Sequence, residues 1–149
     1  MIHLLDVNVL IALLDVRHVA HEAAHDWFGQ WSKQGWATCP ITQNGFLRIA
    51  GAKYYAPNPL PVSQLSEMLG RFCSQPDHRF WSEDFSLLDS ARVNHGQITS
   101  TAQITDTYLL ALAVRNRGRL ATFDRRLSVR AVEGGEEALL IIPTRTGPA

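Results

Sequence analysis

The chain opens with an apolar run that is interrupted by one acid and one amide, Asp6 and Asn8. Residues 2–5 predict a short buried strand, and residues 9–14 predict the start of a helix. Asp6 and Asn8 therefore stand where a strand gives way to a helix. In open parallel sheets, ligands bind in the crevice beyond the carboxyl ends of the strands, and a carboxylate placed there reaches that crevice. Asp is also a common helix cap, so capping and ligand binding both remain open for Asp6.

Short apolar runs and helix-spaced patterns alternate along the rest of the chain. We expect further strands at residues 36–39, 78–81, 120–122 and 139–142, and helices at 19–33, 41–52, 62–73, 84–93 and 105–117. This alternation predicts an α/β protein, a three-layer α/β/α sandwich with a central, mainly parallel sheet of about five short strands. We expect a single domain over residues 1–143 and a flexible tail over residues 144–149.

Two more acids are placed like Asp6. Asp124 follows the expected strand at residues 120–122, and Asp106 falls in the first turn of the helix that begins near Thr105. The carboxyl ends of parallel strands share one edge of a sheet, so Asp6 and Asp124 would lie together, and Asp106 can join them. Converging carboxylates repel one another unless a cation neutralises them. Oxygen ligands favour Mg²⁺ or Mn²⁺ over zinc.

Histidines and cysteines offer weaker signals. Three histidines lie along one stripe at helical spacing and could hold zinc, but no Cys or acid nearby completes the set, and the alternative is that they are ordinary flanking residues. They are His18, His21 and His25. Cys39 and Cys73 have neither a metal nor a redox spacing, which fits a reducing compartment. Because the N-terminus does not resemble a signal peptide and no apolar run approaches the ~20 residues of a membrane helix, we expect a cytoplasmic protein without a membrane partner.

Four segments occur in order along the chain: Leu-Asp-Val-Asn at 5–8, Cys-Pro-Ile-Thr-Gln-Asn-Gly-Phe-Leu-Arg at 39–48, Thr-Asp-Thr-Tyr-Leu-Leu-Ala-Leu-Ala at 105–113 and Ala-Thr-Phe-Asp-Arg-Arg-Leu at 121–127. Together they resemble the PIN-domain ribonucleases, in particular the VapC-type toxins of type II toxin–antitoxin systems. His-Arg-Phe-Trp at 78–81 is similar to one branch of that family. The resemblance implies a Mg²⁺- or Mn²⁺-dependent endoribonuclease toxin, inhibited by a cognate VapB-like antitoxin and forming a homodimer.

The resemblance also assigns roles to single residues. The family's metal-binding acids match Asp6, Asp106 and Asp124, and its supporting polar positions match Asn8, Thr105 and Thr122. Gln43 departs from the family pattern, because it stands where the fourth acid, usually Glu, is expected. Gln keeps a carbonyl oxygen but carries no charge and cannot act as a base. Three interpretations stay open: a functional variant with one tightly held ion, an inactive natural relative, or a sequence altered to suppress toxicity.

The charge distribution suggests where RNA binds. With 14 Lys+Arg and 14 Asp+Glu the formal net charge is zero, so there is no global attraction to nucleic acid. Six arginines nevertheless fall within residues 115–130, beside Asp124. The candidate contacts to RNA phosphates are Arg119, Arg125 and Arg126. For Arg115 and Arg117, favourable charge at a helix C-terminus is a nearly equal alternative.

The chemistry expected of such a site is hydrolysis of RNA by metal-activated water, leaving a 5′-phosphate and a 3′-hydroxyl. Two alternatives remain. A Mg²⁺-dependent phosphatase or phosphotransferase would need a second acid in the first loop, where this chain has Asn8. A catalytically weakened or inactive PIN domain could bind an antitoxin or RNA, and Gln43 supports that reading. An antitoxin would enter an apolar groove, for which the candidate aromatic residues, unless they belong to the core, are Trp27, Trp31, Tyr54 and Tyr55.

Overall fold

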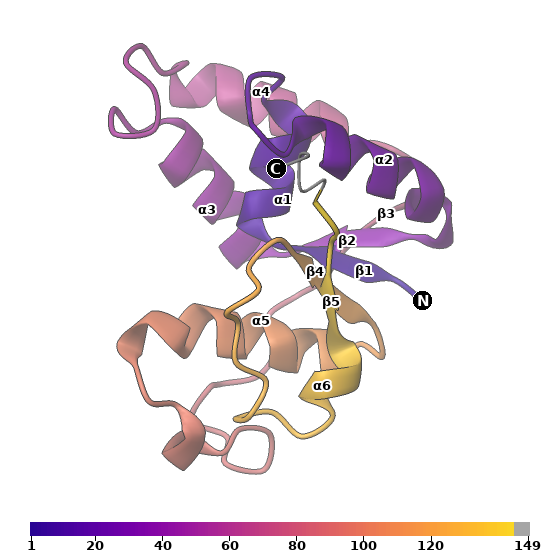
Figure 1. Ribbon diagram of the computed structural model, residues 1–149, viewed down its shortest axis with the longest axis vertical. Coiled ribbons are helices and arrows are strands. Elements are labelled where there is room, and N and C mark those ends of the chain that lie inside the picture. Colours follow the sequence, from indigo (N-terminus) through magenta and orange to yellow (C-terminus); the bar gives the residue numbers. More distant parts are fainter. Residues whose placement is uncertain (145–149) are drawn as a thin grey trace, which may run out of the picture.

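A computed structural model describes residues 1–144 and shows a five-stranded, all-parallel sheet between two layers of helices (Figure 1). The strands are β1 (His3–Leu5), β2 (Trp36–Thr38), β3 (His78–Phe80), β4 (Arg119–Thr122) and β5 (Leu139–Ile141). Their order is β3-β2-β1-β4-β5, which places the first strand of the chain at the centre. His3 is in register with Trp36 on one side and with Arg119 on the other. The α/β/α sandwich and all five predicted strands are therefore confirmed.

The helices divide between the two faces of the sheet. Figure 1 shows α1 (Val7–Leu14), α2 (His21–Trp31), α3 (Pro40–Ala50) and α4 (Val62–Phe72) above the sheet, and α5 (Ile104–Arg115) and α6 (Gly135–Ala138) below it. Short 3₁₀ turns lie at Ser32–Gln34, His95–Gln97 and Thr101–Gln103. Over residues 1–144, no helix is both long and apolar enough to cross a bilayer.

Each face of the central strand has its own hydrophobic core, because successive strand residues point to opposite sides. Leu4 packs in the core between the sheet and α5, and Leu5 packs in the core between the sheet and helices α1 and α3. Both side chains are fully buried. A strand covered on both faces needs an uninterrupted apolar run, and this is why the sequence at 2–5 lacks polar alternation.

The prediction of a helix at residues 84–93 is wrong. The segment forms turns that end in an isolated antiparallel bridge between Val93 and Val132. Short polar side chains there bond to the nearby backbone instead of leaving it free for a helix: Ser86 Oγ accepts from Leu88 N at 3.0 Å, and Asp89 Oδ1 accepts from Ala91 N at 3.0 Å. The four-residue helix α6 was not predicted. The predicted flexible tail lies, apart from Thr144, outside the described residues.

A glycine lets α3 approach the start of α1. A Cβ atom added to Gly45 would lie 2.5 Å from Cγ2 of Val7, the first residue of α1. Since Val7 follows Asp6 directly, this contact also fixes where the end of β1 sits relative to α3.

We expect Gly45→Ala to lower the free energy of unfolding by roughly 1–3 kcal/mol, because a β-branched Val7 has little freedom to move aside. Gly70→Ala in α4 is the matched control, since nothing lies within 4 Å of its added Cβ. This control should raise stability by up to about 1 kcal/mol through helix propensity alone. Urea denaturation followed by circular dichroism measures both, and equal changes in the two variants would contradict close packing at Gly45.

Candidate active site

Asp6 caps α1, which is one of the two roles left open by the sequence, and its side chain also lines a cavity. Its Oδ1 accepts a hydrogen bond from Val7 N at 2.8 Å, and its Oδ2 accepts one from Thr122 Oγ1 at 2.7 Å. Its backbone N donates to Ala121 O at 3.0 Å, which ties the residue to β4. The side chain is 7% exposed, more buried than the strand-end position alone suggested.

The hydroxyl of Thr122 joins three parts of the site. Thr122 Oγ1 donates to Asp6 and accepts from Asn8 Nδ2 at 3.1 Å and from Asp124 N at 3.1 Å. Asn8 Oδ1 in turn accepts from Phe123 N at 3.2 Å. Thr122 has no exposed surface, so its hydroxyl is shielded from bulk water. The end of β1, the start of α1 and the end of β4 are thus fixed to one another by side chains.

The three predicted acids line one cavity of about 340 Å³ at the carboxyl edge of the sheet. The residues around it are Asp6, Val7, Asn8, Ile11, His18, Ile49, Tyr55, Asp106 and Asp124. Asp106 reaches the cavity from the first turn of α5. The sequence did not point to His18, Ile49 or Tyr55 as neighbours of the acids, because their approach depends on how α1, α3 and the loop after α3 pack.

The acids of this cavity repel one another. The pKa of Asp106 is raised to about 6, first by burial and then by the charges of Asp6 and Asp124. The pKa of Asp6 is also raised, chiefly by burial and slightly by Asp124, against the opposing effect of the hydrogen bonds from Thr122 and Val7. A bound cation would relieve this repulsion.

The donor set fits a hard divalent ion. Among residues 1–144, no three His, Cys, Asp or Glu side chains stand close enough to form a complete metal-binding group. Mg²⁺ does not require one, since it keeps several waters and is usually bound through one or two carboxylates. Asp6, Asp106 and Asp124 would therefore hold such an ion partly through water, and their mutual repulsion favours its entry.

Gln43 is tied to β2 and does not line the cavity of the acids. Its Nε2 donates to Thr38 Oγ1 at 3.0 Å, and that hydroxyl lies 2.7 Å from His78 Nε2. The departure from the family pattern thus coincides with a different hydrogen-bond network, at the neighbouring strand. Thr105, predicted as a supporting residue, is exposed, and within the described part of the chain it makes no hydrogen bond with the acids.

The candidate RNA-binding arginines separate into two groups. Arg125 and Arg126 are exposed and directly follow Asp124, whose Oδ1 accepts from Arg126 N at 2.9 Å. Arg119 begins β4 and lies at the opposite edge of the sheet from the acids. Arg115, at the end of α5, bonds to Asp84, with 2.7 Å between Nε and Oδ1.

The histidines do not form a zinc site. His21 Nδ1 lies 2.7 Å from Ala12 O, and His25 Nε2 lies 2.9 Å from Leu13 O, so both rings bond to backbone carbonyls in the last turn of α1. His18 faces the acid cavity instead. No metal-binding group that includes them is present in residues 1–144.

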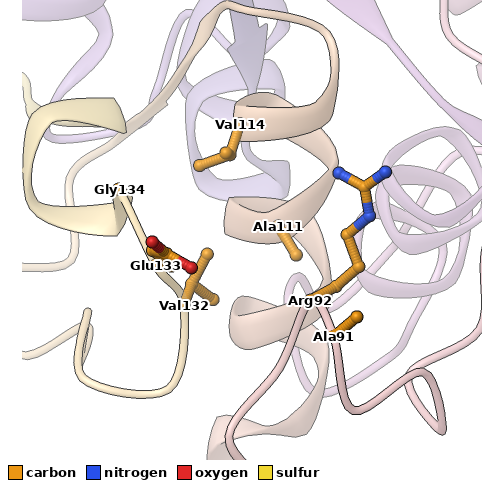
Figure 2. A pocket seen from close by; sticks show the side chains of 7 residues that line it. All are labelled: Ala91, Arg92, Ala111, Val114, Val132, Glu133 and Gly134. Carbon is orange, nitrogen blue, oxygen red and sulfur yellow. The ribbon is translucent and has the colours of Figure 1, made fainter.

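A second hollow, of about 230 Å³, lies beside α5 and contains none of the three acids. Figure 2 shows Glu133 and Arg92 on its two sides, with Ala111, Val114 and Val132 between them. Its walls come from the turns at 84–94 and from the segment before α6. The acid cavity therefore remains the place where charged groups converge.

Known proteins match this chain in sequence and in fold. The PIN domain family model matches residues 3–133. Ribonuclease VapC44 of Mycobacterium tuberculosis is 47% identical over 131 residues, which cover 88% of this chain and 92% of that protein. Ribonuclease VapC39 of the same organism is 40% identical over 136 residues, which cover 91% and 98%. The crystal structure of VapBC2 from Rickettsia felis, bound to a promoter DNA fragment, shares the fold with a TM-score of 0.53 and 14% identity, covering 83% of this chain and 89% of that one.

Replacing the central hydroxyl tests how far the site depends on it. We expect Thr122→Val, which keeps the shape of the side chain, to lower the free energy of unfolding by roughly 1–3 kcal/mol, because Asp6, Asn8 and Asp124 N lose a buried partner. Thr122→Ser keeps the hydroxyl and serves as the control. Guanidinium denaturation of both variants provides the measurement. A Thr122→Val protein as stable as the serine variant would refute the stabilising role of the Thr122 hydroxyl.

The raised pKa of Asp106 predicts a pH-dependent stability in metal-free protein. The acid titrates near 3.8 when unfolded and near 6 when folded, so the folded state favours its protonated form. The free energy of unfolding should therefore fall as pH rises from about 4 to about 6. Asp106→Asn removes this penalty and should exceed the wild type in melting temperature at pH 7 but not at pH 4. If the difference in melting temperature between the wild type and Asp106→Asn does not change with pH, the raised pKa of Asp106 is ruled out.

Proposed function

The chain belongs to the PIN-domain family and within it to the VapC ribonucleases, and on this premise we propose that it is a divalent-metal-dependent endoribonuclease toxin controlled by a cognate antitoxin. The observation that carries the proposal is the convergence of Asp6, Asp106 and Asp124 on one cavity. Three carboxylates from three separate elements have no structural need of one another, and their repulsion opposes folding. Such an arrangement is expected where the charges serve binding of a cation.

The chain's own residues have distinct tasks in this proposal. A bound Mg²⁺ or Mn²⁺ would supply Lewis-acid chemistry, lowering the pKa of a water and compensating charge on the phosphate. Asp6, Asp106 and Asp124 would hold the ion, and Thr122 fixes the orientation of the Asp6 carboxylate through the bond at 2.7 Å. Arg125 and Arg126, exposed next to Asp124, would contact phosphates of the RNA on either side of the cleaved bond.

An apolar groove beside the acids is the proposed place for the antitoxin. It has a volume of about 340 Å³, is lined by α1, α3, α4 and the loop at 54–61 between α3 and α4, and shares Ile11 and Tyr55 with the acid cavity. A helix or extended segment with apolar side chains would fill it, and a basic residue at its end would pair with the carboxylates. Of the four aromatic candidates, Tyr55 lines this groove, whereas Trp27 belongs to the core. The relative from Rickettsia felis is described as a VapBC complex, which supports a VapB-like partner.

We expect the protein to act as a homodimer in the cytoplasm. The phosphatase alternative is disfavoured because Asn8, at the position where that chemistry needs a second acid, is bonded to Thr122 and Phe123 N. The weakened or inactive binding module is favoured by one observation, the amide of Gln43 bonded to Thr38.

Cleavage of a mixed RNA pool with Mg²⁺ or Mn²⁺ tests the proposed activity. We expect Asp106→Asn to reduce the rate by at least about 100-fold, since even residues that only support a metal ligand can cost that much. Asp89→Asn is the matched control, because Asp89 is exposed in the turns at 84–94 and its Asn keeps the acceptor for Ala91 N. The same loss in both variants, or cleavage unchanged in Asp106→Asn, would refute the assignment.

Two further comparisons separate the active enzyme from the binding module. Equal cleavage by the wild type and Gln43→Glu would show that three carboxylates suffice, whereas cleavage that appears only in Gln43→Glu would favour the module. Metal binding is measured separately, by the melting temperature. Mn²⁺ should raise the melting temperature of the wild type, because a ligand that binds only the folded state stabilises it. The increase should be smaller in Asp106→Asn, which lacks one of the three carboxylates.

A further inference from the structure

The turn that follows α1 brings a histidine into the wall of the acid cavity. His18 is partly buried and lines this cavity together with Asp6, Asp106 and Asp124. Neither the resemblance nor the sequence pattern gave His18 a role at the acids. Its neighbours His21 and His25 differ from it, since their rings face backbone carbonyls. The role of His18 at this cavity depends on which ring nitrogen is free to bind a ligand.

Several hydrogen bonds hold the turn in place. Asp15 Oδ1 accepts from Arg17 N at 2.9 Å, and Asp15 Oδ2 accepts from the hydroxyl of Tyr55. His18 N donates to Asp15 O at 3.0 Å, and His18 O accepts from His21 N at 3.0 Å. The backbone of His18 is thus fixed between α1 and α2, so its ring does not depend on a free loop for its position.

A backbone contact also fixes the tautomer of the ring. His18 Nδ1 lies 3.0 Å from Ala20 N and accepts its proton, since a backbone N–H can only donate. The proton of the neutral imidazole therefore sits on Nε2. Nε2 makes no hydrogen bond within residues 1–144, so this N–H group is available as a donor.

An RNA phosphate that enters this cavity needs such a donor. The other polar groups of the wall are partly or fully engaged: Asn8 donates one of its two amide protons to Thr122 and accepts from Phe123 N, and the Tyr55 hydroxyl donates to Asp15. The carboxylates repel a phosphate. On the basis of the proposed function, we propose that His18 Nε2–H binds a non-bridging oxygen of the RNA phosphate in the acid cavity. His18 is then a substrate-binding residue of this site.

Two substitutions separate this role from the structural one. In His18→Asn the Oδ1 atom can still accept from Ala20 N, as in an Asx turn, but the side chain is too short to replace Nε2. In His18→Gln the amide reaches toward the position of Nε2, whereas the acceptor for Ala20 N is lost. A hydrogen bond to a charged oxygen predicts a loss of about 10- to 100-fold in kcat/KM for His18→Asn, with the melting temperature unchanged. His18→Gln should lose less activity but melt at a lower temperature.

Controls distinguish failure of this inference from failure of the proposed function. His95→Asn changes a histidine whose Nε2 contacts Leu87 O in an exposed segment outside the cavity, and it should leave kcat/KM unchanged. If Asp106→Asn abolishes cleavage while His18→Asn cleaves like the wild type, His18 does not bind the phosphate and the ribonuclease reading stands.

A measurement without turnover completes the test. In uniformly ¹⁵N-labelled protein containing Mg²⁺, adding a short single-stranded RNA analogue whose linkages resist cleavage should shift the His18 Nε2–H signal. A shift of the Asn8 side-chain signal without any change at His18 would overturn the inference. No shift anywhere in the protein at RNA concentrations that support cleavage would count against both this inference and RNA binding at the acids.

Discussion

The hydrogen bond between the Thr122 hydroxyl and the Asp6 carboxylate is the interaction on which the site depends. It joins the end of β4 to the junction of β1 and α1, and the same hydroxyl receives the amide of Asn8 and the backbone N–H of Asp124. A buried carboxylate without such partners would be neutral or destabilising. With them, Asp6 is buried and oriented, and the remaining repulsion falls largely on Asp106, which is closer to solvent.

The sequence predicted the parts of the fold that follow from local patterns. Buried parallel strands require continuous apolar runs, and acids at strand ends stand out against them, so Asp6 and Asp124 could be placed at one edge. The segment at 84–93 could not be read in this way, because Ser86 and Asp89 compete with helix formation by bonding their own backbone. The position of His18 and the network of Gln43 depend on how distant elements pack, and no spacing along the chain reveals either.

Gln43, at the position where the resemblance implies an acid, is bonded to β2 and does not line the cavity of the three acids. Its amide donates to Thr38 Oγ1, which a carboxylate at this position could not do. Three acids line the cavity, and Gln43, Thr38 and His78 lie outside it. Gln43 thus belongs to a hydrogen-bond network of β2 and β3 that is separate from the network around Thr122.

The central place of β1 in the sheet has a consequence for synthesis of the chain. Asp6 leaves the ribosome before its partner Thr122, which follows 116 positions later. Contacts of such long range form late, after the intervening chain has collapsed around them. The nascent polypeptide therefore carries Asp6 without the site around it, and the three acids can converge only after β4 and the residues that follow it have been synthesised.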